Sequence, residues 1–303
     1  MNVGVIGGSG FIGSHVVDKL VEHGHEVTVF DIKKPHREDV AHINIDITDV
    51  SKTTVALTGD YDVIYLLAAV ADVNDVYRNP VEATAVNVMG VVNVLEAVRR
   101  NNIGRLVMAS TTWVYQLAAE GKEDSPFYVQ RTEHLYTSQK LSAELACQSY
   151  QKMYNQKSTI LRYGIPYGPR ARGGTVLAAF VKRAFAGEPL TIFGKGDQPR
   201  NFLYVEDLAE GNVAALSDVA VNQTYNLEGK RPVTVKEVAE TVQKLIGKVK
   251  IEYAEARPGD FGGKAASYEK ARKDLGWEPK IDFEEGARRY AEWYKANVLK
   301  APR

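Results

Sequence analysis

Short apolar runs alternate with longer amphipathic stretches along the first half of the chain. The runs have the length and β-branched composition of buried strands, and the stretches repeat apolar residues at helical spacing. The predicted strands are 2–6, 25–30, 41–45, 62–68, 105–110 and 158–163, and the main predicted helices are 11–23, 80–101 and 135–154. Strands that alternate with helices pair in parallel, so we predict a doubly wound α/β sheet of the Rossmann type.

This rhythm breaks after residue 163, where a segment rich in glycine and proline begins. Helical patterns at 176–187, 234–247 and 283–297 follow among short strands and turns. We therefore predict a Rossmann domain over 1–163 and a smaller C-terminal α/β lobe over 164–303. We also expect residues 202–220 to fold back and pack on the first domain.

Composition excludes few functions but narrows the setting. The 303 residues carry a formal net charge of zero and are 45% hydrophobic, which gives no support to nucleic-acid binding or to a membrane-surface role. The single cysteine, Cys147, lies in a helical pattern and is expected to be buried. The six histidines show no metal-ligand spacing, so we predict no metal site. With no apparent signal peptide or spanning segment, we expect a cytoplasmic protein.

A glycine pattern joins the first predicted strand to the first predicted helix. Gly7, Gly10 and Gly13 are spaced GxxGxxG in "VIGGSGFIG". Glycine permits a tight turn and a close approach of the backbone to a pyrophosphate, and the helix start adds unpaired N–H groups with partial positive charge. Because the pattern sits between strand and helix, it predicts dinucleotide binding rather than a plain turn.

Acidic residues follow the next two predicted strands. Asp31 comes directly after the second strand, where a carboxylate can bind both ribose hydroxyls and repel a 2′-phosphate, which favours NAD. Lys33 and Lys34 keep NADP open as an alternative, although a solvated loop is their ordinary role. Asp46 and Ile47 end the third strand, where they either flank an adenine or form a simple strand–helix junction.

The clearest catalytic pattern is Tyr136 with Lys140 in "YTSQK". Four residues apart on a helix, the two side chains share one face. A nearby ammonium, helped by a positive nicotinamide ring, is expected to lower the pKa of the phenol. The tyrosine can then take a proton from a substrate hydroxyl while hydride leaves the same carbon.

Taken together, these residues resemble the extended short-chain dehydrogenase/reductase family, in its nucleotide-sugar epimerase and dehydratase branch. The resemblance covers nearly the whole chain and is specific for the branch, though not for one substrate. Its marks are "GGSGFIGSHVVDKL", "LLAAVADV", "NVMGVVNVLEA", "STTWVY", "YTSQK", "GIPYGPR", "RNFLYVEDLAEG", "RPGD" and "KARKDLGWEPK".

The resemblance implies a role for each matching position. Tyr136 is the expected acid/base, Lys140 its partner, and Thr111, four residues before Tyr115, completes the catalytic triad, whereas Ser110 is expected to be structural. The residues expected to bind NAD are Gly7, Gly10, Phe11, Ile12, Gly13, Asp31, Asp46, Ile47, Leu67, Ala68, Ala69, Asn87, Tyr136, Lys140 and Tyr163. Those expected to bind substrate are Thr111, Thr112, Arg200, Arg257 and Lys264.

Three departures from the family pattern matter. Dehydratases follow the triad threonine with an Asp–Glu pair, whereas Thr112 and Trp113 stand here, which argues against dehydration. The family usually reads "RYFNVYGPR", but this chain reads "RYGIPYGPR", so Ile165 replaces an asparagine that contacts the diphosphate. Gln116 replaces the usual glycine after "VY", so the loop over the sugar is expected to differ.

The leading hypothesis is a nucleotide-sugar 4-epimerase of the UDP-glucose/UDP-galactose type that uses tightly bound NAD through a 4-keto intermediate. A UDP-glucuronate or other NDP-sugar 4-epimerase stays open, since Lys264 is placed to favour a uronate, as does a keto-sugar reductase that exchanges NADP(H). A nucleotide-sensing regulatory protein is the non-enzyme alternative. The expected ligand is a UDP- or dTDP-sugar.

The long predicted helices also suggest an assembly. They carry apolar residues beyond one stripe, and family members usually pair these helices, so we expect a homodimer through a four-helix bundle. The residues that suggest it are Val91, Val92, Leu95, Leu141 and Leu145.

Overall fold

Seven parallel strands form the central sheet of the computed structural model, which describes residues 1–115, 121–127, 134–171, 173–247, 249–255 and 266–300. The strand order is β11-β6-β5-β4-β1-β2-β3, a doubly wound order that confirms the predicted Rossmann-type fold. The strands are β1 (Asn2–Ile6), β2 (Glu26–Phe30), β3 (Ala41–Ile43), β4 (Val63–Leu66), β5 (Arg105–Thr111), β6 (Ser158–Tyr163) and β11 (Thr224–Leu227).

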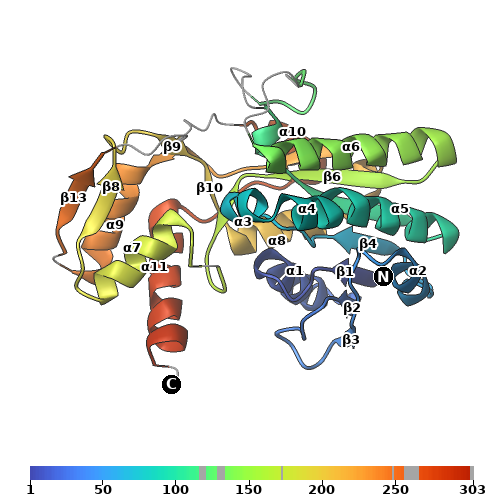
Figure 1. Ribbon diagram of the computed structural model, residues 1–303, viewed down its shortest axis with the longest axis horizontal. Coiled ribbons are helices and arrows are strands. Elements are labelled where there is room, and N and C mark those ends of the chain that lie inside the picture. The colour runs from blue at the N-terminus through green and yellow to red at the C-terminus, as the bar shows by residue number, and fades with distance from the viewer. Residues whose placement is uncertain (116–120, 128–133, 172, 248, 256–265, 301–303) are drawn as a thin grey trace.

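Helices cover both faces of this sheet (Figure 1). On one face, α1 (Phe11–Glu22) and α8 (Val205–Ala214) pack together on a core that includes Val5 and Leu208. The other face is covered chiefly by α5 (Gly90–Arg100) and α6 (Leu135–Tyr154), whose buried residues include Cys147. The remaining helices of this half are α2 (Val50–Ala56), α3 (Val73–Arg78), α4 (Pro80–Thr84), π-helical η1 (Ala85–Met89) and the 3₁₀ turn η2 (Thr112–Tyr115).

Strand β11 lies far along the chain from the rest of the sheet, and the apolar pattern did not predict it. Its four residues pair with β6 in parallel, with Leu227 opposite Tyr163. It follows α8 and the 3₁₀ turn η4 (Asp218–Ala220), so the chain returns to the sheet after it has entered the second lobe. As a result, the edge of the sheet is completed by residues from beyond 163.

The C-terminal lobe has its own apolar core, which includes Phe180, Leu190 and Tyr290. Its strands pair only in twos, and its helices surround them on the left of Figure 1. The strand pairs are β7 (Ile165–Tyr167) with β10 (Phe202–Tyr204), β9 (Pro199–Arg200) with β12 (Val233–Thr234), and β8 (Leu190–Phe193) with β13 (Ile251–Ala254). The helices are α7 (Val176–Phe185), α9 (Val235–Ile246), α11 (Phe283–Tyr294) and η5 (Lys295–Leu299). Helix α10 (Glu269–Leu275) instead packs on the core of the central sheet, beside β11.

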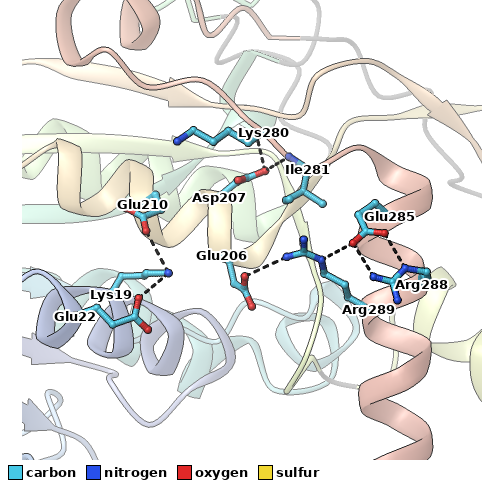
Figure 2. A network of polar contacts seen from close by, with 10 residues as sticks. All are labelled: Lys19, Glu22, Glu206, Asp207, Glu210, Lys280, Ile281, Glu285, Arg288 and Arg289. Carbon is cyan, nitrogen blue, oxygen red and sulfur yellow. Dashed lines mark hydrogen bonds and ion pairs between the residues drawn. The ribbon is translucent and has the colours of Figure 1, made fainter.

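Helix α8 links the two parts of the molecule, as Figure 2 shows. Its Glu210 pairs with Lys19 of α1 at 3.2 Å. The carboxylate of Asp207 accepts the backbone N–H groups of Lys280 and Ile281 at 2.9 and 2.7 Å. One face of α8 therefore contacts the sheet layer, while its first turn holds the segment that leads into α11.

The helices proposed for the dimer bury most of the apolar residues that suggested it. Val91, Leu95 and Leu141 belong to the core and are at most 7% exposed, which corrects their assignment to an outer stripe. Leu145 on α6 is 49% exposed, and Met89, the residue directly before α5, is also exposed. The helical stretch Pro80–Arg100 is long and apolar enough to span a membrane, but half of its apolar window is buried inside the protein, as in a core helix.

Candidate active site

The glycine loop between β1 and α1 closes against the end of β4. Gly7 has a φ of +84°, and a Cβ on it would lie 2.4 Å from the backbone nitrogen of Ala68. A Cβ on Gly13 would lie 2.0 Å from the carbonyl oxygen of Gly7. Gly10 caps α1 without a side chain, so the first N–H groups of the helix, those of Phe11 and Ile12, have no side-chain cap. This cradle fits a pyrophosphate, which backbone N–H groups at a helix start bind well.

Asp31 ties the end of β2 to the glycine loop. Its carboxylate accepts the backbone N–H of Ser9 at 3.0 Å and that of Lys33 at 2.9 Å. The side chains of Lys33 and Lys34 are exposed. The carboxylate is thus held at the edge where the second ribose of a dinucleotide is expected.

Asp46 and Ile47 form a strand–helix junction. The Asp46 carboxylate accepts the Thr48 N–H and hydroxyl at 2.9 and 2.8 Å. Ile47 is buried, and a Cβ on Gly90 would lie only 2.7 Å from its Cδ1 methyl group. Both side chains are therefore engaged within the protein, and an adenine contact from this junction stays a prediction.

Thr111, Tyr136 and Lys140 are linked at the carboxyl edge of β5. The Lys140 ammonium donates to the carbonyl oxygen of Ala109 at 3.0 Å and lies 5.9 Å from the centre of the Tyr136 ring. The Tyr136 ring meets the Trp113 ring edge to face at 6.3 Å, and the backbone N–H of Trp113 donates to Thr111 Oγ1 at 3.2 Å. The three predicted catalytic side chains are therefore joined by a short path of contacts.

Burial dominates the protonation of this pair. It lowers the pKa of Lys140 to about 8, partly opposed by the Glu144 carboxylate. It raises the pKa of Tyr136, which is the opposite of the expected effect of the neighbouring lysine. Desolvation disfavours each charged form, and at 5.9 Å from the ring centre the ammonium does not offset it in the protein alone.

Asn87 connects the segment after β4 to helix α6. Its amide exchanges two hydrogen bonds with the backbone of Val70, both 2.9 Å, and donates to Gln139 Oε1 at 2.8 Å. It thus fixes the segment after β4, which includes Leu67 and Ala69, to the helix that carries Tyr136.

Tyr163 turns its side chain away from the carboxyl edge of the sheet. Its hydroxyl donates to Asn212 of α8 at 2.6 Å, and only 5% of the residue is exposed. Its carbonyl oxygen accepts the Thr112 hydroxyl at 3.4 Å. A cofactor contact at this position would therefore come from the backbone.

The predicted diphosphate residues are only partly covered by the structure. Arg200, on β9, is partly buried and donates to the carbonyl of Pro199 at 3.1 Å. Ile165 begins β7, where its N–H donates to the carbonyl of Asn201 at 3.0 Å. Arg257, Lys264 and Gln116 lie outside the described residues.

A buried polar network behind the triad was not predicted. Arg162, which is 2% exposed, pairs with Glu144 at 2.7 Å and with the Tyr115 hydroxyl at 2.6 Å. Ser110 also donates to Glu144, and this contact gives Ser110 the structural role expected for it. Asn226 of β11 accepts the Tyr115 hydroxyl at 2.6 Å. These residues are far apart in sequence. The sequence signal for the network is a single arginine, Arg162, in an apolar strand pattern.

Comparison with known proteins agrees with this geometry. Residues 3–227 match the model of the NAD dependent epimerase/dehydratase family. The chain belongs to this family. It is 31% identical to a UDP-glucuronate 4-epimerase of Thermodesulfobacterium geofontis over 97% of this chain and 96% of that protein. It is also 31% identical to a putative UDP-glucose 4-epimerase of Methanocaldococcus jannaschii, over 97% and 98% of the two chains.

Solved structures of the family have the same fold. A UDP-glucose 4-epimerase of Thermus thermophilus in complex with NAD superposes with a TM-score of 0.87 at 31% identity, covering 98% of this chain and all of the other. A UDP-glucuronic acid 4-epimerase of Bacillus cereus, with UDP-glucuronic acid and NAD, gives 0.87 at 28% identity, with 98% and 99% covered. Membership confirms an NAD-dependent enzyme of the epimerase type, with NAD as its cofactor.

The described residues show no metal centre. No group of three or more His, Cys, Asp or Glu side chains among them is placed to hold a metal ion.

Proposed function

We propose that this enzyme is a UDP-sugar 4-epimerase of the UDP-glucose/UDP-galactose type, with a catalytic triad of Thr111, Tyr136 and Lys140. The arrangement of these three side chains at the carboxyl edge of β5 carries the proposal. The glycine cradle and the Asp31 carboxylate would hold NAD, and the lobe over 164–303 would hold most of the sugar nucleotide. Relatives named as epimerases of UDP-glucose and of UDP-glucuronate support the reaction class.

Each side chain has a defined task in this proposal. Bound NAD supplies reversible oxidation at C4. Tyr136 takes the proton of the C4 hydroxyl and later returns it, while the Lys140 ammonium, held by the Ala109 carbonyl, lowers the cost of the phenolate. Thr111 accepts the Trp113 N–H, so its own proton is directed to another acceptor, which we assign to the C4 oxygen.

The residues after Thr111 favour epimerisation over dehydration. Thr112 and Trp113 offer no carboxylic acid where dehydratases have an acid pair. Glu228 lies near Thr112, but it is 1% exposed and so does not reach a bound sugar in this conformation. The keto sugar would therefore turn about its link to the diphosphate and be reduced again on its other face.

UDP-glucuronate is the second candidate substrate. A relative with that name is 31% identical, and family structures contain UDP-glucuronic acid. Lys264, at a position expected near the sugar, would suit a carboxylate. A regulatory protein is a weaker alternative, because Tyr136 and Lys140 are retained together, whereas a keto-sugar reductase would use the same pair and would differ in exchanging NADP(H) at each turnover.

A substrate panel tests the proposal. Purified enzyme with NAD is incubated with UDP-glucose, UDP-N-acetylglucosamine and UDP-glucuronate, and the C4 epimers are quantified by NMR. We expect UDP-galactose from UDP-glucose without net reduction of NAD. If the enzyme prefers UDP-glucuronate and Lys264→Ala loses this preference, UDP-glucuronate would replace UDP-glucose as the proposed substrate. A stoichiometric change in nicotinamide absorbance would favour the reductase, and no epimer from any UDP- or dTDP-hexose would overturn the proposal.

We also propose a homodimer formed through α6 and the helical stretch Pro80–Arg100. Exposed apolar side chains on these helices support it, and Leu145 and Met89 are 49% and 55% exposed.

A further inference from the structure

Three neighbouring strands end in one row at the carboxyl edge of the sheet. In β5, β6 and β11 the last paired residues meet at Tyr163 in the middle strand. The residues that directly follow these three strands are Thr112, Gly164 and Glu228, in that order across the edge. Side chains two residues apart share a face, so this row lies on the same face as Arg162 and its buried network, one step closer to the site.

The middle position of this row has no side chain, and the Glu228 carboxyl group occupies its space. A Cβ on Gly164 would lie 1.9 Å from Glu228 Oε1. Neighbouring strands are about 4.8 Å apart, so a glutamate on β11 extends across the bare middle strand toward β5. The family motif quoted above has phenylalanine in place of Gly164. The space beside this position would thus be filled by an aromatic ring in the family motif, and it is filled by the Glu228 carboxyl group in this chain.

The chemistry of this carboxyl group follows from its burial. Glu228 is 1% exposed, and the Gly229 N–H lies 3.4 Å from Oε1. Burial raises the pKa of Glu228 to about 8, and hydrogen bonding with the Gly229 N–H and the Thr112 hydroxyl opposes this rise. The neighbouring charges of Arg162 and Glu144, one row below, are paired with each other at 2.7 Å. At neutral pH the side chain is therefore mainly a neutral acid with one O–H donor, which suits Thr112 Oγ1 as acceptor because the Thr112 hydroxyl donates its own proton to the Tyr163 carbonyl oxygen at 3.4 Å.

We propose that Glu228 is a positioning residue for the epimerase reaction: its carboxyl group, lodged over Gly164, holds the Thr112 hydroxyl and with it the turn that carries Thr111 and Trp113. Thr112 is the first residue of η2 and directly follows Thr111. The Trp113 N–H, from the same turn, orients the Thr111 hydroxyl at 3.2 Å. The inference rests on the proposed function, because this orientation matters only when Thr111 touches the sugar.

A double-mutant cycle on the NAD-loaded enzyme tests this role. The variants are Glu228→Leu, which keeps the volume without hydrogen bonds, Thr112→Val, and the two combined. We expect each single change to lower kcat about tenfold, as for loss of one hydrogen bond in a site, with KM within about twofold. The double variant should be no slower than either single one, because both changes remove the same contact. Glu228→Gln, which can still hydrogen-bond, should retain kcat within about twofold.

Two kinetic outcomes would overturn the role. Effects that multiply in the double variant would show that Glu228 does not act through Thr112. An unchanged kcat in Glu228→Leu would show that it positions nothing.

A second readout needs no turnover. Infrared difference spectra of wild type minus Glu228→Gln should show the carbonyl band of a protonated carboxylic acid at pH 7, and this band should shift in Thr112→Val. If the carboxyl group is ionised instead, its carboxylate stretching bands should shift in Thr112→Val, and bands of either form that do not shift would overturn the contact. A wild type that is inactive on every sugar nucleotide would instead overturn the proposed function, and the band shift alone would then decide whether Glu228 holds Thr112.

Discussion

The charge of Lys140 depends on pH near neutrality, because its ammonium is buried and is held by a neutral carbonyl group. Its ammonium donates to the Ala109 carbonyl, and burial lowers its pKa to about 8. A lysine with a lowered pKa is charged below that value and neutral above it. Since the proposed mechanism needs the positive charge beside Tyr136, we expect kcat to fall as the pH rises through about 8.

The Lys140→Arg variant isolates this titration. Arginine stays charged throughout the range. We expect a lower kcat, because the longer guanidinium fits the site less well, but no fall between pH 7 and pH 9, measured as the profile of kcat for epimer formation. A wild-type profile that is flat across this range would contradict the assignment, as would an equal fall in the arginine variant.

Tyr136 is expected to be the acid/base that takes and returns the proton, while Thr111 hydrogen-bonds the C4 oxygen. Its replacement by phenylalanine keeps the ring that packs against Trp113 at 6.3 Å and removes only the hydroxyl. General acid–base groups contribute about 10²- to 10⁴-fold to rates, so Tyr136→Phe should lower kcat by about 10³-fold. Thermal stabilisation by NAD, measured in parallel, should change little. A variant that keeps more than a tenth of the wild-type rate would exclude Tyr136 as the acid/base.

At the scale of elements, the first turn of α8 contributes strongly to stability. The Asp207 carboxylate is buried and accepts the N–H groups of Lys280 and Ile281. Asp207→Ala leaves both part-buried donors without this acceptor; a hydrogen bond to a charged group contributes about 1.5–3 kcal/mol, and water partly replaces the lost acceptor at these donors. We therefore expect a loss of about 2–4 kcal/mol in the free energy of unfolding, measured by urea denaturation.

The neighbouring acid on α8 is a matched control. Glu206 pairs with Arg289 at 3.7 Å, and both side chains are about 40% exposed. An exposed pair at this distance contributes at most about 1 kcal/mol, so Glu206→Ala should change the stability little. Equal losses in both variants would show that the buried carboxylate has no special role.

Local patterns predicted six of the seven strands of the sheet, all but β11. The glycine loop and Asp31 could be placed at its edge because each lies in a short segment next to a predicted strand, where spacing determines geometry. Strand β11 has only four residues, too few for a clear period, and it joins the sheet after a long excursion through the second lobe. Its placement depends on tertiary packing rather than on its own pattern.

The buried polar groups of the site could not be predicted for a related reason. Arg162 is a single charged residue in an apolar strand pattern, and Glu228 directly follows β11, which has no clear pattern of its own. What gives them a role is a partner on another element, such as Glu144 on α6 or the bare position of Gly164. Sequence spacing carries no information about those pairs. The shifted pKa of Tyr136 also depends on burial, which a four-residue spacing does not reveal.

At the scale of the whole molecule, the proposed dimer depends on side chains that the single chain leaves in solvent. Leu145 is 49% exposed on α6, and Met89 is 55% exposed at the end of η1, directly before α5. A glutamate at either position would place a charge inside a four-helix interface, where an unpaired charge is costly. We therefore expect Leu145→Glu with Met89→Glu to yield a monomer at micromolar concentration by light scattering, while the wild type has twice that mass. Tyr253→Glu, at a 58% exposed position on β13 of the other lobe, is the control and should leave the mass unchanged. A monomeric wild type would exclude the dimer, and a double variant that keeps the wild-type mass would place the interface on another surface.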